Sequence, residues 1–172
     1  MRLAVVAAAI HAAPDDPFVP AWADMLSALS RHADVEVFAL RYPETRLRYD
    51  VFGASVTPLG FGATRLRHSP PLWAAAAAAI EAAHRRRPFD AVVAFQSAEP
   101  GFVAARAARR IGRPLLVHVA GGELVCDRAV GYGSRCGLVE RVQVARAMRG
   151  ADVVTVGSAA MLHLAERRLG RR

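Results

Sequence analysis

Hydrophobic and polar residues follow two distinct rhythms along this chain. Apolar runs of strand length occur six times, at Leu3–Ile10, Val35–Leu40, Val51–Leu59, Ala91–Phe95, Leu115–Ala120 and Val153–Val156. Helical spacing of apolar residues separates most of them, at Pro20–His32, Leu72–Arg87, Gly101–Ile111, Leu138–Arg149 and a last helix capped by Ser158. This alternation predicts an α/β fold of Rossmann-like type, with helices on both faces of a mostly parallel sheet of about six strands. Because no linker or repeat interrupts it, we expect residues 1–172 to form one domain.

The two chain ends refine this picture. The start, "MRLAVVAAAIHAAPDD", has some features of a secretory signal, but Arg2 alone supplies the basic region before the apolar run, and that run is short. A first buried strand is therefore the favoured interpretation. In the last helix, Met161, Leu162, Ala165 and Leu169 share one face, which we expect to pack on the sheet.

The net charge is +8 and every basic residue except histidine is arginine. Such a charge can attract nucleic acid, anionic lipid or phosphorylated substrates. It is also explained by a coding bias spread over solvated helix faces. The densest run, "HRRRP" at His84–Pro88, ends a predicted helix, where cations are favourable, and no aromatic residues interleave with it to stack bases. We expect no nucleic-acid partner, and peripheral membrane contact stays open.

Cys126 and Cys136 lie in one glycine-containing segment without histidines at zinc-site spacing. Free thiols in a reducing compartment are the favoured interpretation, with a local bridge as the alternative. No stretch of about 20 apolar residues suggests a membrane span. We therefore expect a cytoplasmic protein, with attachment to the inner face of the membrane left open, and no metal site.

The segment "HVAGGELV" ends the fifth predicted strand with two glycines and an acid. In an open parallel sheet, ligands bind beyond the carboxyl ends of the strands, and Gly121, Gly122 and Glu123 fall at such an end. Glycines let a ligand approach the backbone, and a carboxylate can accept hydrogen bonds from hydroxyl groups. The three residues are a candidate site for a polyhydroxylated ligand such as a sugar; a tight turn is the competing explanation.

Other polar residues should reach the same edge. Gln96, Ser97 and Glu99 follow the fourth strand, although Ser97 and Glu99 are also ordinary residues for the first turn of a helix. After the first strand, His11 and Asp15 are expected to be exposed and to contact an acceptor. His118 lies within an apolar strand, which favours packing over catalysis. We assign no catalytic residue.

Nucleotide-binding and hydrolase motifs are absent from the sequence. "HAAPDDPFVP" stands where a dinucleotide-binding G-x-G-x-x-G would follow the first strand, and there is neither a P-loop nor a G-x-S-x-G elbow.

Three stretches together resemble the amino-terminal domain of GT-B glycosyltransferases of family 4: "FDAVVAFQSAEPGFVAARAARRIGRPLLVHVAGGEL", "VGYG" and "RGADVVTVGSAAMLHLAERRLG". The resemblance covers residues 89–170 well and the first 40 residues loosely. It implies one half of a two-domain enzyme in which this half binds the acceptor and the other half binds a nucleotide-sugar donor. It also implies transfer with retention of anomeric configuration, usually without a metal, and no cofactor beyond the nucleotide-sugar co-substrate.

The resemblance places Gly121, Gly122 and Glu123 at the family loop that reaches the transferred sugar. Many relatives carry a histidine where this chain has Ala120, so that histidine's role does not pass to His118. Many also have two glycines after the first strand, which are absent here.

Because the sequence ends at Arg172, we expect the donor domain to be absent from it and the chain alone to be inactive. The face that would pack against the donor domain is then exposed, and we expect it to favour self-association. The acceptor-binding half of a hexosyltransferase acting on a glycan, lipid or small molecule is the leading hypothesis. The alternative is a stand-alone, Rossmann-like, non-enzymatic binding module that uses a basic surface to bind nucleic acid, a membrane or a protein partner.

Overall fold

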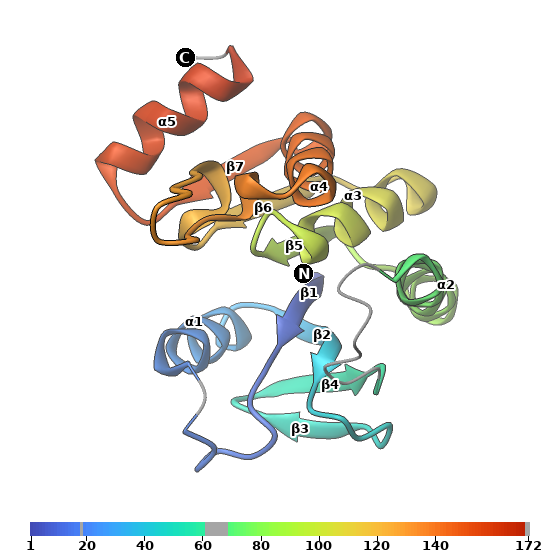
Figure 1. Ribbon diagram of the computed structural model, residues 1–172. Helices are drawn as coiled ribbons and strands as arrows, with labels where there is room; N and C mark the ends of the chain where they lie inside the picture. The colour runs from blue at the N-terminus through green and yellow to red at the C-terminus, as the bar shows by residue number, and fades with distance from the viewer. Residues whose placement is uncertain (18, 61–68, 171–172) are drawn as a thin grey trace.

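A computed structural model describes residues 1–17, 19–60 and 69–170 of the chain (Figure 1). Its seven strands are β1 (Arg2–Ala9), β2 (Asp34–Tyr42), β3 (Tyr49–Val51), β4 (Ala54–Pro58), β5 (Ala91–Phe95), β6 (Leu115–Val119) and β7 (Val153–Val156). Its five α-helices are α1 (Pro20–Ser30), α2 (Pro70–Arg86), α3 (Glu99–Ile111), α4 (Leu138–Gly150) and α5 (Ala159–Leu169). Two short 3₁₀ turns, η1 (Gly122–Leu124) and η2 (Ser134–Cys136), lie between β6 and α4.

The strands form one sheet in the order β3-β4-β2-β1-β5-β6-β7, and every neighbouring pair is parallel except β3 with β4. The predicted α/β fold is confirmed, and so is the interpretation of the chain start as a buried strand. The predicted third strand, Val51–Leu59, is wrong as a single element. Phe52 and Gly53 both have positive φ angles there, 51° and 78°, and turn the chain into the β3–β4 hairpin.

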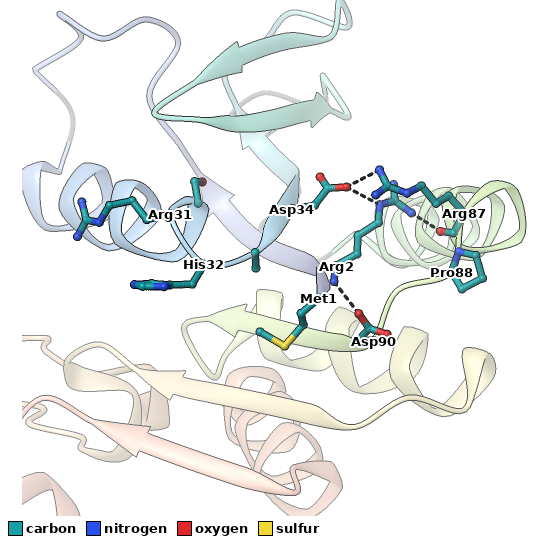
Figure 2. A pocket seen from close by; sticks show the side chains of 10 residues that line it. Met1, Arg2, Arg31, His32, Asp34, Arg87, Pro88 and Asp90 are labelled. Carbon is teal, nitrogen blue, oxygen red and sulfur yellow. Dashed lines mark hydrogen bonds and ion pairs between the residues drawn. The ribbon is translucent and has the colours of Figure 1, made fainter.

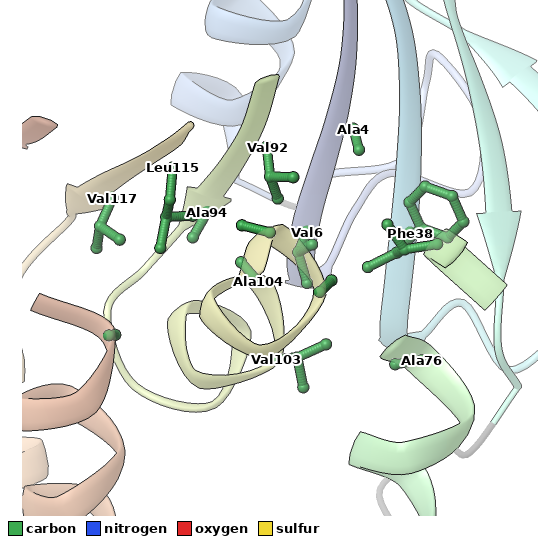
Figure 3. Close-up of a cluster of buried hydrophobic side chains, with 14 of the residues drawn as sticks. Ala4, Val6, Phe38, Ala76, Val92, Ala94, Val103, Ala104, Leu115 and Val117 are labelled. Carbon is green, nitrogen blue, oxygen red and sulfur yellow. The ribbon is translucent and has the colours of Figure 1, made fainter. Parts of the chain in front are cut away.

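Helices α2, α3 and α4 cover one face of the sheet and α1 covers part of the other (Figure 1). Figure 3 shows the larger core, where side chains of adjacent strands, such as Val6, Phe38 and Val92, meet Val103 and Ala104 of α3. Small residues bring the helices close together: a Cβ added at Gly101 would lie 2.8 Å from the Cβ of Ala147 on α4. The alanine-rich composition therefore serves tight packing between helices and sheet.

The helix boundaries follow local chemistry closely. Ser69 caps α2 through its side chain, and basic residues fill the last turn of that helix, as the "HRRRP" interpretation predicted. Helix α3 begins at Glu99 rather than at the predicted Gly101, and Gly112 closes it in the left-handed conformation with φ 63°. Most of the long loop expected at Gly60–Pro71 lies outside the described residues.

Helix α5 lies beside β7 at the end of the molecule farthest from β3 (Figure 1). Ala165 is buried against Leu124, Val144 and Met148, so the helix packs through its apolar face. The predicted membership of that face is wrong at one position. Leu162 is 45% exposed, and Leu164 joins the contact instead.

Candidate functional site

The loops after β5 and β6 are joined at the carboxyl edge of the sheet. Phe95 pairs in register with His118, and the backbone N–H of Gln96 donates to the carbonyl of His118 at 3.0 Å. Gln96 has a φ of 101°, a conformation that residues with a Cβ seldom adopt. Such backbone strain persists where surrounding contacts fix it, and it clusters at functional sites. The first candidate segment is therefore held rigidly against the second.

The Glu123 side chain organises this junction. It is 6% exposed, and its carboxylate accepts backbone N–H groups from both loops. Oε1 lies 3.3 Å from the Ser97 nitrogen and 3.1 Å from the Ala120 nitrogen, and Oε2 lies 2.6 Å from the Gly121 nitrogen. A carboxylate offers about four acceptor positions, so about one remains for another donor. Most of the hydrogen-bonding capacity of Glu123 thus shapes the loop.

A cavity of about 370 Å³ opens beside this carboxylate, and its described lining consists of Gln96, Ala120, Gly121, Gly122, Glu123, Gly131, Tyr132, Gly133, Ser134 and Glu140. Small residues predominate, so much of the wall is backbone, with a few polar side chains between. Such a wall can present N–H and C=O groups, a hydroxyl and carboxylates to a ligand rich in hydroxyl groups. The position is the one where open parallel sheets bind ligands.

Tyr132 covers one glycine of the pair. A Cβ built on Gly122 would lie 2.7 Å from Cζ of Tyr132 and 2.9 Å from its hydroxyl oxygen. At Gly121 the nearest atoms to such a Cβ are 3.9 Å away. Only a residue without a side chain at position 122 lets the tyrosine ring rest there. Because Tyr132 is 54% exposed, its ring forms a solvent-facing wall of the cavity.

The segment that carries Tyr132 is a closed hairpin. A disulfide joins Cys126 to Cys136, so the expectation of free thiols is wrong and the local bridge is present. The backbones of Asp127 and Tyr132 exchange two hydrogen bonds, of 2.7 and 2.9 Å. The two cysteines lie ten positions apart in a glycine-containing segment, and this spacing was the only sequence sign of the pairing.

Glu99 and Ser97 are at the same edge of the sheet but do not line the described cavity. The Glu99 carboxylate accepts from Arg41 at 2.6 and 2.9 Å and from Nε1 of Trp73 at 2.7 Å. The hydrogen bond with Glu99 is the main cause that raises the pKa of Arg41. Ser97 is fully buried, and its hydroxyl has no hydrogen-bond partner among the described residues.

The residues after β1 lie apart from the cavity lining. His11 is 2% exposed and packs edge-on against Phe52, with ring centroids 5.2 Å apart. The expectation that His11 is exposed is therefore wrong, because the β3–β4 hairpin covers it: its carbonyl accepts from the Tyr49 hydroxyl at 2.7 Å. Asp15 is exposed, as expected.

His118 is half-buried and does not line the cavity. Its Nδ1 lies 3.0 Å from Oγ1 of Thr155 on β7. Its ring stands edge-on to Trp22 at 6.3 Å between centroids. These contacts agree with the interpretation of His118 as a packed residue.

A second hollow, of about 530 Å³, lies at the opposite edge of the sheet (Figure 2). Its charged groups engage one another: Arg2 lies 3.6 Å from Asp34, Asp34 also pairs with Arg87, and the backbone N–H of Arg2 donates to Asp90 at 2.7 Å. These pairs hold the first residues of β1 and β2 against the segment between α2 and β5. We assign them a structural role, since ligands of such sheets bind at the other edge.

The part of the chain that the structure describes contains neither a metal-binding cluster nor a membrane-spanning helix. No group of three or more His, Cys, Asp or Glu side chains there could hold a metal ion. Among the same residues, no helix has both the length and the apolar character that a membrane crossing requires.

Comparisons with known proteins bear on the fold and the family of this chain. No curated protein matches the sequence. Among solved structures, the UDP-GlcNAc 2-epimerase of Methanocaldococcus jannaschii matches 98% of the chain with a TM-score of 0.62 and 11% identity. The UDP-N-acetylglucosamine 2-epimerase of Rickettsia bellii matches all of it with a TM-score of 0.60 and 13% identity. At such identities the likeness shows the fold alone, and the chain spans 42% of the length of each.

The sequence comparison is more specific than the structural one. The model of the glycosyl transferase 4-like domain matches residues 19–172, which is most of the chain. That range includes every residue of the described cavity lining. The structural matches add that the fold corresponds to about half of a GT-B protein. The chain therefore belongs to the glycosyl transferase 4-like domain family.

Proposed function

We propose that this chain is the acceptor-binding half of a retaining glycosyltransferase, which moves a sugar from a nucleotide-sugar donor to a glycan, lipid or small-molecule acceptor. A single observation carries the proposal: in a domain of this family, a cavity lined by glycines and polar side chains lies at the carboxyl edge of the sheet. A second domain, which binds the donor, would complete the active site.

Within this proposal the candidate residues divide the work. Glu123 holds Ala120 and Gly121 in place, and its remaining acceptor position on Oε2 meets a sugar hydroxyl. The Tyr132 ring, over Gly122, provides an apolar surface for a sugar face and a hydroxyl at its edge. Gln96 supplies an amide from the rigid turn after β5.

The remaining predicted residues contribute less directly. Asp15, exposed after β1, contacts the part of the acceptor farther from the cavity. The buried His11 ring supports its loop, and the carboxylate of Glu99, held by Arg41 and Trp73, fixes the start of α3. Catalytic groups that stabilise the leaving diphosphate belong to the donor-binding domain.

The first test maps binding on the chain itself. Amide chemical shifts are recorded by NMR while methyl α-D-glucopyranoside or UDP-glucose is added. We expect the methyl glycoside to shift the amides of Gly121, Gly122 and Tyr132, and UDP-glucose to have a weaker effect. Shifts that centre on another surface, or the absence of any, would contradict the assignment. Purified 1–172 should show no glycosyl transfer.

The second test concerns stereochemistry and needs a protein that also contains a donor-binding half. Early in the reaction, proton NMR of the anomeric region distinguishes a product with the donor's configuration from an inverted one. Retention is the expected result. Inversion would overturn the retaining assignment and leave the acceptor-binding role intact.

A further inference from the structure

The groove between α4, α5 and η2 is the strongest unassigned feature of the molecule. It encloses about 560 Å³ and is lined by five arginines, Arg135, Arg141, Arg146, Arg149 and Arg168, together with apolar residues. The described lining of this groove, called the arginine groove below, contains no aspartate or glutamate. It begins one residue from the candidate cavity, since Ser134 lines the cavity and Arg135 the groove.

The charges in the arginine groove are not neutralised by the described part of the protein. None of the five arginines forms an ion pair among those residues. Arg135 is half-buried, and burial lowers its pKa, with further lowering by the positive charges of Arg168 and Arg141. Cations held together without counter-charges form a site that an anion stabilises.

The solvent-facing stripe of α4 adds an apolar component. Leu138, Arg141, Val142, Ala145 and Arg149 follow one another at helical spacing and share a face. Leu138 is 73% exposed and Val142 is 44% exposed, whereas Gln143 and Ala147 on the opposite face are buried. A stripe that alternates arginines with exposed aliphatic side chains fits the boundary between lipid headgroups and acyl chains.

We propose that the arginine groove and the α4 stripe form a docking surface for an anionic phospholipid membrane. The arginines bind headgroup phosphates through their planar, bidentate guanidinium groups, and Leu138 and Val142 enter the interface beside them. A free phosphate ligand would use the arginines but gain nothing from the exposed leucine. The apolar component therefore favours the lipid as the occupant.

Vesicle co-sedimentation tests this surface. The purified chain is mixed with vesicles of phosphatidylglycerol and phosphatidylcholine, or of phosphatidylcholine alone. The groove variant carries Arg135→Gln, Arg141→Gln and Arg168→Gln. A matched control loses the same charge elsewhere, through Arg31→Gln, Arg85→Gln and Arg86→Gln, and Leu138→Asn tests the apolar component at constant charge. Circular dichroism melts identify variants that fail to fold, and these are replaced by single substitutions.

We expect the chain to bind only the vesicles that contain phosphatidylglycerol. The groove variant should bind these vesicles more weakly, by on the order of fivefold for each arginine removed. The control should lose a few-fold at most, and Leu138→Asn should weaken binding at unchanged salt dependence. Equal losses in the two triple variants would overturn the proposal, because net charge alone would explain them. So would an absence of vesicle binding, or groove-dependent binding of inorganic phosphate or a DNA oligonucleotide in its place.

Discussion

Oε1 of Glu123 lies 3.3 Å from the backbone nitrogen of Ser97, a residue 26 positions earlier in the chain. This hydrogen bond joins the loop after β5 to the loop after β6. The same oxygen accepts from Ala120, and the other carboxylate oxygen accepts from Gly121. One acidic side chain thus fixes the turns after β5 and β6, which form the floor of the candidate cavity.

Replacement of Glu123 by glutamine should therefore loosen the cavity floor. The amide nitrogen cannot accept a hydrogen bond, so at least one of the three backbone donors loses its buried partner. We expect the free energy of unfolding to fall by about 1–3 kcal/mol, the usual cost of an unsatisfied buried group. Chemical denaturation measures it, and the exposed Glu44→Gln is the control. Equal stability of the two variants would show that the Glu123 hydrogen bonds contribute nothing net.

The contact between Gly122 and Tyr132 makes a prediction about coupling. An alanine at position 122 would place its Cβ 2.7 Å from the tyrosine ring, so Gly122→Ala should displace that ring and cost up to about 1 kcal/mol. Gly121→Ala should displace no side chain, because the nearest atoms to such a Cβ, in Glu123 and Tyr132, are 3.9 Å away. Glycoside binding should fall only in the Gly122 variant.

A double-mutant cycle isolates this interaction. If the ring is what opposes a side chain at position 122, the cost of Gly122→Ala disappears in a Tyr132→Ala background. The free energies of unfolding of the four proteins give the coupling energy. Additive effects would mean that position 122 requires glycine for another reason.

The hydrophobic pattern identified most of this fold because buried parallel strands are short continuous apolar runs, whereas helices repeat their apolar residues at spacings of three and four. It failed at the β3–β4 hairpin, since Phe52 is an aromatic residue that adopts positive φ, a conformation no apolar pattern encodes. It also misplaced Leu162. That error follows from the position of α5 at the end of the sheet, where the helix contacts both β7 and η1 rather than the strands alone.

The candidate site was predictable in position but not in contacts. Gly121, Gly122 and Glu123 could be placed at the carboxyl edge because strand direction is fixed by strand–helix alternation. The sequence held no sign that Glu123 would turn inward to three backbone N–H groups. Tyr132 and Glu140 were missed as lining residues because they reach the cavity through the disulfide-closed hairpin and the start of α4, far along the chain from the glycine pair.

The disulfide between Cys126 and Cys136 should stabilise the hairpin that carries Tyr132. Closing a loop of this length restricts the unfolded chain, which the loop-entropy model values at about 3 kcal/mol or less. We expect the double variant Cys126→Ser, Cys136→Ser to unfold at lower denaturant concentration and to bind the methyl glycoside more weakly. Dithiothreitol should reproduce both effects in the native chain and leave the double variant unchanged. A shift of equal size in both proteins would exclude the disulfide as its cause.

His84 should make stability depend on pH. Burial is the main cause that lowers its pKa, and Arg113 and Arg2 lower it further; its Nδ1 accepts from the backbone N–H of Phe89 at 3.0 Å. The folded protein therefore favours the neutral ring. Below about pH 6.5, the ordinary histidine pKa, the unfolded chain takes up a proton that the folded chain resists. The stabilising contribution is thus complete above that pH and is lost as the pH falls.

Urea denaturation of the native chain and of His84→Gln at pH 7.5 and pH 5.0 tests this effect. Glutamine keeps an acceptor for the Phe89 N–H but does not titrate. The free energy of unfolding of the native chain should fall more between the two pH values than that of the variant, because the other five histidines are common to both. Parallel losses would assign the acid sensitivity to those other groups. A larger loss in His84→Gln would show that protonated His84 stabilises the fold, which requires a raised pKa rather than a lowered one.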